Sequence, residues 1–257
     1  MESTGFGSAE VGIESLIENL SFFSSWALAK LDVAVLISGG KDSALALYRA
    51  MKVGHKIKCL VTMIPQRPDS WMFHYPNIQL TKLFAEAAGF PLVKADASGV
   101  KEKELNSLKA LLGTLDVEAV VSGAILSQYQ KTRIDRVCEE LGLISIAPLW
   151  QQDQFGLMAE IIELGFHVII TGVYAHGLDR EWLGRLIDRK VLDDLVELNR
   201  KYGISIVGEG GEYETLVLDA PYFNKRIQIL KARIVWEGSS GYLLVEDAKL
   251  EAKAHTY

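Results

Sequence analysis

Residues 35–47 read VLISGGKDSALAL, and this stretch decides the fold. An apolar run ends in the polar turn Ser38-Gly39-Gly40-Lys41-Asp42-Ser43, after which a second apolar run begins. α/β proteins use a strand, a tight glycine turn and a helix to direct backbone N–H groups and the positive end of the helix at an anion. Adjacent glycines let the backbone approach that anion closely, because they carry no Cβ. The stretch therefore predicts a phosphate-binding loop after the first strand of a parallel sheet.

The loop is not of the common ATP-hydrolysing type, which requires the pattern G-x-x-x-x-G-K-[ST]. Here Lys41 directly follows the second glycine, and Asp42 stands beside it. Ser38 and Ser43 add hydroxyl donors, and Lys41 adds a positive charge. Asp42 would repel a phosphate unless it caps the helix or helps to hold Mg²⁺. The plain alternative is a glycine turn with a helix cap and no ligand, but a buried strand before the turn and a helix after it favour a phosphate site.

Apolar strand-like runs alternate with helical ones over most of the chain. Runs rich in Val, Ile and Leu predict buried strands at 33–37, 57–64, 92–94, 119–122 and 168–173. Helical spacing with a following glycine predicts helices near 43–53, 77–88, 101–112, 128–141 and 153–164. This alternation predicts an α/β fold with a doubly wound, mostly parallel sheet covered on both faces.

The C-terminal part of the chain has a different pattern. A charged helix is predicted at 189–202, and strands then follow in close succession at 204–207, 215–218, 226–236 and 242–245. This pattern indicates a smaller C-terminal α+β lobe. The predicted organisation is an N-terminal extension at 1–30, an ATP-binding domain at 31–150 and a substrate-binding lobe at 151–257. Because no low-complexity linker separates the two lobes, we expect them to pack closely.

Composition limits the class of protein. Hydrophobic residues make up 49% of the chain and charged residues 23%, which is the balance of a globular protein. The net charge of −6 argues against a general nucleic-acid binder. No apolar stretch reaches the ~18 residues of a membrane span, and the acidic first residues do not resemble a signal peptide. The two cysteines, Cys59 and Cys138, lie far apart and suit a reducing compartment. We expect a cytoplasmic protein without a membrane or direct nucleic-acid partner.

A second notable segment, residues 208–215, contains three glycines and three carboxylates. It reads Gly208-Glu209-Gly210-Gly211-Glu212-Tyr213-Glu214-Thr215. The segment is either a solvated bulged turn or part of a site, and the apolar strand that follows at once favours a site. Clustered carboxylates can take a proton from an amine, bind Mg²⁺ or hold a cationic substrate.

Two further segments point to the same edge of the sheet. Residues 122–133 read SGAILSQYQKTR and again pass from a strand through small residues into a helix. Ser127 suits a helix N-cap, while Gln130, Lys131 and Arg133 can reach a phosphate or a carboxylate. Residues 71–77, WMFHYPN, form an aromatic loop that is either packed or one wall of a substrate cleft.

The 38–43 string resembles the pyrophosphate loop of the N-type ATP pyrophosphatases, which split ATP between its α and β phosphates. The resemblance implies an adenine nucleotide alpha hydrolase-like (PP-loop) fold. Together with further strings, it resembles the diphthine–ammonia ligase family from about Leu31 onward. Those strings are the aromatic loop at 71–74, GAILSQYQKTRI at 123–134, PLW at 148–150, GLDREWLGR at 177–185 and GEGGEYETLVLDAP at 208–221. The glycine–acid string is the most discriminating of them.

The resemblance implies a reaction. The family activates the carboxylate of diphthine, a modified histidine of translation elongation factor 2, with ATP, and ammonia then displaces AMP to give diphthamide. Ser38, Gly39, Gly40, Lys41, Asp42 and Ser43 would hold ATP and the pyrophosphate, with Mg²⁺ as cofactor. Catalytic roles would fall to Lys41, Asp42, Glu212 and Glu214. The substrate pocket would comprise His74, Tyr129, Gln130, Arg133, Glu209, Gly210, Gly211, Glu212, Tyr213, Glu214 and Thr215.

Two alternatives stay open. One is another adenylating enzyme of the same fold, acting on a small metabolite or tRNA, and the other is a nucleotide-binding sensor that has lost catalysis. Cys59 falls in a predicted buried strand and Cys138 in a predicted helix, so neither suits a glutaminase nucleophile and free ammonia is the simpler nitrogen source. The length suggests a short archaeal-type form, because eukaryotic members are expected to carry further C-terminal domains. If the reading is right, the 38–43, 127–133 and 209–215 segments must meet in space.

Overall fold

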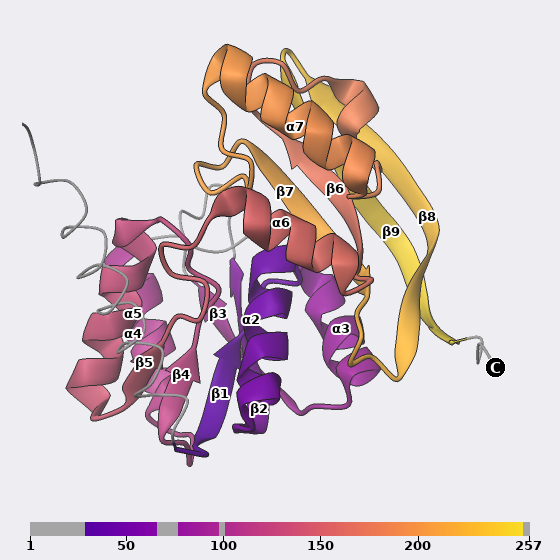
Figure 1. Ribbon diagram of the computed structural model, residues 1–257. Helices are drawn as coiled ribbons and strands as arrows, with labels where there is room; N and C mark the ends of the chain where they lie inside the picture. Colours follow the sequence, from indigo (N-terminus) through magenta and orange to yellow (C-terminus); the bar gives the residue numbers. More distant parts are fainter. Residues whose placement is uncertain (1–28, 66–76, 98–100, 254–257) are drawn as a thin grey trace, which may run out of the picture.

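The computed structural model describes residues 29–65, 77–97 and 101–253, which form two sheets with helices packed around them (Figure 1). The elements of the first lobe are β1 (Asp32–Leu36), α2 (Lys41–Val53), β2 (Lys56–Pro65), η1 (Ile78–Leu80), α3 (Thr81–Ala88), β3 (Leu92–Ala97), α4 (Lys101–Leu112), β4 (Ala119–Val121), α5 (Gln128–Leu141) and β5 (Ile144–Ile146). Those that follow are α6 (Gln154–Glu163), β6 (His167–Val173), η2 (Arg180–Trp182), α7 (Arg189–Tyr202), β7 (Tyr213–Asp219), β8 (Lys225–Glu237) and β9 (Ser240–Ala252).

The first sheet is parallel throughout and has the strand order β3-β2-β1-β4-β5. One of its faces packs on α2 and α3, and the other on α4 and α5. Burial on both faces explains why residues 33–35 of β1 and all of β4 are apolar or small, with almost no exposed surface. The order reverses at β1, where the chain turns to one side for β2 and to the other for β4. Such a switch point opens a crevice at the carboxyl ends of the strands, which is where the phosphate loop lies.

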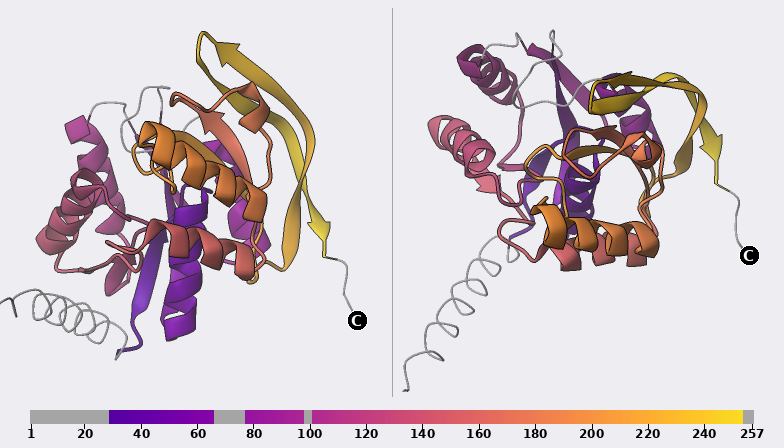
Figure 2. Two further views of the ribbon diagram at one scale, coloured as in Figure 1. Left: turned by 45° about the horizontal axis from the view of Figure 1, so that its top comes forward. Right: turned by 90° about the horizontal axis from the view of Figure 1, so that it is seen from above.

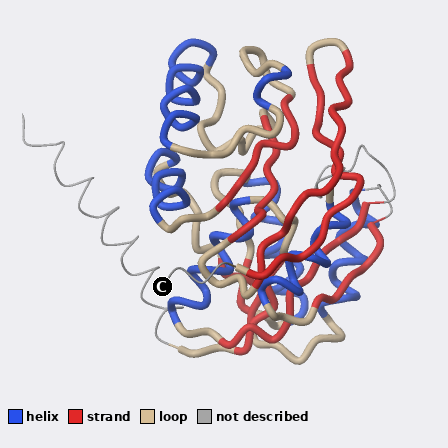
Figure 3. Tube along the Cα trace, turned by 90° about the vertical axis from the view of Figure 1, so that its right-hand side faces the viewer, coloured by secondary structure: helices blue, strands red, loops and turns tan. Residues whose placement is uncertain are grey.

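The second sheet is antiparallel, with the order β7-β6-β9-β8. Helices α6 and α7 lie side by side across one of its faces (Figures 1 and 2). Strands β8 and β9, of 13 residues each, form a hairpin that runs the length of the lobe and ends in a tight turn at the top of Figure 3. Cross-strand ion pairs line this hairpin, among them Lys231 with Glu246 at 2.7 Å and Arg233 with Glu246 at 2.8 Å. The predicted fold class, a doubly wound parallel sheet plus a smaller α+β lobe, is confirmed.

One hydrophobic core joins the two sheets. Val35 of β1, Leu47 of α2, Val168 of β6, Leu192 of α7 and Val217 of β7 belong to the same buried cluster. Tyr222, between β7 and β8, stacks near Tyr48 of α2, and its hydroxyl donates to the Ala44 carbonyl at 3.0 Å. The lobes therefore pack closely, as the sequence predicts.

Two element predictions are wrong. Residues 204–207 form turns and not a strand, because side chains take their backbone N–H groups: Gln154 Oε1 accepts from Ile206 and Val207, and Glu212 Oε1 accepts from Ser205. The strand β5 is missing from the prediction, because it has only three residues and a serine interrupts its apolar run.

Candidate active site

The phosphate loop (residues 38–43) turns from β1 into α2 and is closely packed. Gly39 has a φ of +88°, which glycine adopts without strain. Gly40 is the N-cap residue of α2 and makes no side-chain capping bond. The Ser43 hydroxyl donates to the Gly40 carbonyl at 3.0 Å, and the Ser38 N–H donates back to Ser43 Oγ at 3.3 Å. The loop is thus held in shape by its own serines while the N-terminus of α2 keeps no internal cap.

The acidic segment (residues 208–215) contacts this loop directly. Thr215 Oγ1 accepts a hydrogen bond from the Lys41 N–H at 3.1 Å. Two residues along β7, the Val217 N–H donates to the Gly39 carbonyl at 2.9 Å. A Cβ on Gly40 would lie 3.3 Å from Thr215 Oγ1, which is a tight contact, so glycine favours this close approach. The edge of β7 therefore shapes the phosphate loop from outside.

Lys41 joins the two segments through its side chain. The residue is 2% exposed, and its Nζ donates to the Val207 carbonyl at 2.5 Å and to Asp42 Oδ2 at 3.0 Å. The ammonium also lies 5.3 Å from the ring centre of Tyr213. In this arrangement the positive charge faces the turn before the acidic segment, and Asp42 is the more exposed partner.

The third segment, 122–133, is tied to the same place by Glu209. Its Oε1 accepts hydrogen bonds from three consecutive backbone N–H groups, those of Ile125 at 3.2 Å, Leu126 at 3.0 Å and Ser127 at 2.8 Å. These groups precede the N-terminus of α5, where a carboxylate is electrostatically favoured. Gly123 completes the contact, since a Cβ there would lie 2.7 Å from the Ser43 nitrogen. The three segments that the sequence singles out therefore touch one another.

The other residues of the acidic segment turn inward. Glu212 Oε1 accepts from the Ser205 N–H at 2.9 Å, and its Oε2 is buried with no hydrogen-bond partner in the described part of the chain. The Tyr213 hydroxyl donates to the Ile206 carbonyl at 2.6 Å, and burial raises the pKa of this phenol well above its ordinary value. Gly210 lies against the Glu212 carboxylate, since a Cβ there would be 2.8 Å from Oε1, and Gly211 adopts a φ of +81°. Glu212 and Tyr213 thus hold the segment in its turn.

Sequence reasoning missed Tyr174, which follows β6. This residue is 42% exposed, and the Glu214 carboxylate is a close electrostatic neighbour of its hydroxyl. Burial of part of the ring and the charge of Glu214 raise the pKa of Tyr174, which keeps the hydroxyl protonated. No motif points to Tyr174, because its partner lies forty residues away on the neighbouring strand.

The predicted substrate residues on α5 lie beside this region. Tyr129 is 37% exposed, and the Arg133 guanidinium stacks on its ring at 3.6 Å, one helical turn along. The Gln130 N–H donates to Ser127 Oγ, which caps the helix. The predicted residue His74 lies outside the described residues.

Comparison with known proteins identifies the family. Residues 31–145 match the diphthamide synthase N-terminal domain, and residues 153–250 match the diphthamide synthase C-terminal domain. The chain belongs to the diphthine–ammonia ligase family. Diphthine–ammonia ligases of Bos taurus and Homo sapiens are 36% and 35% identical to it over 233 residues, which is 82% of this chain and 87% of each relative. The diphthine–ammonia ligase of Schizosaccharomyces pombe is 38% identical over 231 residues, but these span only 38% of that protein.

These relatives confirm the predicted family and the class of ATP-dependent ligase. They do not confirm the archaeal-type form, because the bovine and human ligases match over 87% of their own length and an extent like this one is therefore not restricted to archaea. A predicted subunit of tRNA methyltransferase from Methanocaldococcus jannaschii also resembles the structure. It shares 16% identity at a TM-score of 0.42, over 74% of this chain and 97% of that one.

Gly40, the N-cap residue of α2, makes no side-chain capping bond, although Thr215 Oγ1 accepts from the Lys41 N–H of the first turn. The positive end of α2 therefore faces the loop, where α/β proteins commonly bind an anion. Among the described residues, no group of three or more His, Cys, Asp and Glu is placed to hold a metal ion.

Both cysteines of the ligase are buried and free. Burial raises the pKa of Cys59, and burial together with nearby Asp135 raises that of Cys138 to about 11. Neither thiol has the exposure or the lowered pKa of a nucleophile. In addition, none of the helices in the described ranges is long and apolar enough to cross a membrane.

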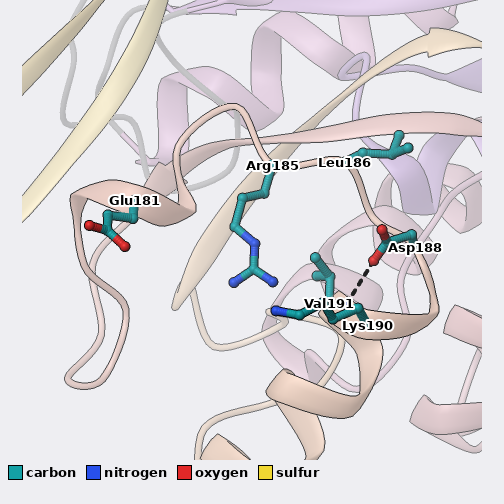
Figure 4. Close-up of a pocket in the computed structure, with 6 residues that line it drawn as sticks. All are labelled: Glu181, Arg185, Leu186, Asp188, Lys190 and Val191. Carbon is teal, nitrogen blue, oxygen red and sulfur yellow. Dashed lines mark hydrogen bonds between the residues drawn. The ribbon is translucent and has the colours of Figure 1, made fainter.

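A hollow of about 430 Å³ lies apart from the phosphate loop, at the start of α7 (Figure 4). Part of the GLDREWLGR string lines it, and Arg185 extends from the segment after η2 toward Lys190. Both of these cations pair with Asp194, at 2.5 Å and 3.6 Å respectively. Asp188 caps α7 through the Val191 N–H at 2.8 Å. The GLDREWLGR string is therefore joined to α7 by the ion pair between Arg185 and Asp194.

Proposed function

We propose that this protein forms diphthamide on translation elongation factor 2, by adenylating the diphthine carboxylate with ATP and passing the acyl group to ammonia. The observation that carries the proposal is the mutual contact of three segments around the start of α2: Thr215 with the Lys41 N–H, Glu209 with the Ser127 N–H, and Gly123 with the Ser43 backbone. The family membership supports the reaction class, and the contacts support our assignment of that reaction to one site.

Each segment has a separate task in this proposal. The phosphate loop binds the β and γ phosphates through N–H groups at the start of α2, so that pyrophosphate leaves as a stabilised anion. Asp42 is the candidate ligand for Mg²⁺, which would offset negative charge on the phosphates. Glu209, Glu212 and Tyr213 keep the acidic segment closed on the loop, while Glu214 faces the substrate side. Lys41 links the two segments, because its ammonium donates both to Asp42 and to the Val207 carbonyl.

The bond changes follow from the products. A carboxylate oxygen of diphthine attacks the α phosphorus, and the bond to the bridging oxygen of pyrophosphate breaks. The nitrogen of ammonia then attacks the acyl carbon, loses a proton, and AMP leaves with the bonding electrons. Holding the acyl adenylate beside the fixed donors of the loop raises its chance of meeting ammonia before water.

The decisive experiment incubates the protein with ATP, ammonium and elongation factor 2 that carries diphthine. We expect the factor to change from acid to amide by mass spectrometry, with AMP and pyrophosphate released and with full dependence on Mg²⁺ after EDTA treatment. Release of ADP would contradict adenylation. AMP release without any change in the factor would instead favour an adenylating enzyme with a small metabolite or tRNA as substrate.

A further inference from the structure

A row of residues crosses the second sheet next to the phosphate loop. Gly172 of β6 lies opposite Glu214 of β7 on one side and opposite Tyr242 of β9 on the other. Directly opposed residues of antiparallel strands point to the same face of the sheet. Glu214 and Tyr242 therefore flank a position that carries no side chain.

Tyr174 fills the space above this glycine. A Cβ on Gly172 would lie 2.7 Å from the Tyr174 hydroxyl oxygen and 2.9 Å from a ring carbon, so the ring folds back over the strand. Glu214 and Tyr242 are both close electrostatic neighbours of the Tyr174 hydroxyl. Two phenol rings and one carboxylate thus gather in one place, and the Tyr174 ring remains 42% exposed.

This cluster lies beside the proposed site of adenylation. Glu214 directly precedes Thr215, whose hydroxyl oxygen accepts from the Lys41 N–H. Leu216 lies on the same face of β7 as Glu214, because alternate residues of a strand share a face. The Leu216 side chain reaches the phosphate loop, since a Cβ on Gly39 would lie 3.7 Å from it. A ligand anchored at the cluster can therefore extend toward the loop.

We propose that Tyr174, Glu214 and Tyr242 bind the quaternary ammonium group of the substrate. Aromatic faces combined with a carboxylate are the chemistry that recognises such a cation, which is bulky, weakly hydrated and unable to donate hydrogen bonds. The inference rests on the proposed function, because diphthine carries a trimethylammonium group on the carbon that bears its reacting carboxylate. Binding the cation would place that carboxylate near the phosphate loop.

The test compares two forms of elongation factor 2, one with the trimethylammonium group and one with an unmethylated amine at the same nitrogen. In Tyr174→Leu and Glu214→Gln we expect the KM for the trimethylated factor to rise about tenfold, with kcat little changed. The preference of these variants for the trimethylated over the unmethylated factor should also fall. Tyr174→Phe, which keeps the ring, should retain most of that preference. Exposed Tyr202 of α7 and Glu237 of β8 provide control variants, Tyr202→Leu and Glu237→Gln, which should leave the preference unchanged.

If Tyr174 had only a structural role, Tyr174→Leu would have a lower melting temperature but the same preference between the two factors, and that result would overturn the proposal.

Titration with tetramethylammonium chloride, against sodium chloride at equal ionic strength, tests the cluster without the elongation factor. We expect shifts of tyrosine ring signals by NMR in the wild type but not in Tyr174→Leu. If the wild type fails to form the amide, the proposed function is wrong, but this titration still tests the cation site. Absence of tetramethylammonium binding in the wild type would contradict the cation site.

Discussion

At the scale of single residues, the site depends on glycines that let two backbones touch. Gly123 shows this best, because its missing side chain leaves room for the Ser43 nitrogen and the Asp42 carbonyl carbon, which would lie 2.7 and 2.8 Å from a Cβ. Both neighbours are backbone atoms that cannot rotate away. The shape of the phosphate loop is therefore set partly by a residue eighty positions later in the chain.

We predict that Gly123→Ala displaces the phosphate loop. The added methyl group should cost about 1–3 kcal/mol of unfolding free energy and raise the KM for ATP by at least tenfold. Urea unfolding and AMP release measure the two effects. Gly142→Ala is the matched control: its φ of +69° makes alanine strained, but nothing lies within 4 Å of the added Cβ. That variant should lose stability and keep its KM for ATP. Equal KM values in both variants would refute the role of Gly123.

The two thiols allow a prediction from pKa values. A raised pKa means that the reactive thiolate forms only at higher pH, and at pH 8 a thiol with a pKa of about 11 is ionised to only ~0.1%. We expect Cys59 and Cys138 to react with a thiolate-specific reagent at pH 8 only after unfolding. Treatment of the native protein should leave amide formation intact, and glutamine should not replace ammonium. Fast labelling of the native protein would contradict this expectation.

At the scale of elements, the turn before β7 acts as a clamp between the lobes. Glu209 holds the start of α5, Gln154 of α6 holds residues 205–207, and Lys41 of α2 holds Val207. Three helices thus meet at one turn, although each reaches it with a different type of group.

We predict that Glu209→Ala weakens this clamp. Three backbone N–H groups at the start of α5 would lose their acceptor, which should lower the free energy of unfolding by about 1–3 kcal/mol. Glu209→Gln keeps an acceptor oxygen and should recover much of that loss. Thermal unfolding and the KM for ATP report on the change, with exposed Glu237→Ala as the control. If Glu209→Ala were as stable as the control, the three hydrogen bonds would contribute nothing.

Apart from β5, the sequence predicted the elements of the first sheet well, because the other strands are largely apolar runs and the helices are followed by glycines. It also predicted that the segments around SGGKDS and GEGGEYET meet in space, since both are unusual combinations of residues. It did not predict what their side chains do. The partners of Glu209 lie 82 to 84 positions away, and a carboxylate that holds a helix start looks the same in sequence as one that binds a substrate. Tyr174 was missed for the same reason, and strand formation at 204–207 was prevented by side chains from elsewhere.

At the scale of the whole molecule, the two lobes share one core. The same buried cluster includes Val35 of the first sheet and Val217 of the second, and the Tyr222 hydroxyl bonds to α2. The buried cluster on the α2 side of the first sheet thus includes residues of the second sheet. The division into 31–150 and 151–257 therefore describes the topology of the chain. The shared core means that the stability of each lobe depends on the other.

We predict a single cooperative unfolding transition. Far-UV circular dichroism and calorimetry should give the same midpoint, with equal calorimetric and van't Hoff enthalpies. A fragment of residues 31–150 should not fold, because it would expose the face that α6, α7 and β7 cover. Two separated transitions, or a folded fragment, would show that the lobes are independent.

The charged hairpin has a consequence for the behaviour of the protein in concentrated solution. Strand β8 ends the second sheet, and a long unpaired edge invites pairing with a second molecule. Lys231 and Arg233 place positive charges along this edge, and Lys231 also lowers the pKa of Glu246, so that its carboxylate stays ionised into acidic solution. Replacing both cations with valine should produce oligomers by light scattering while amide formation at low concentration continues. Colloidal stability would then depend on a strand that lies outside the proposed catalytic site.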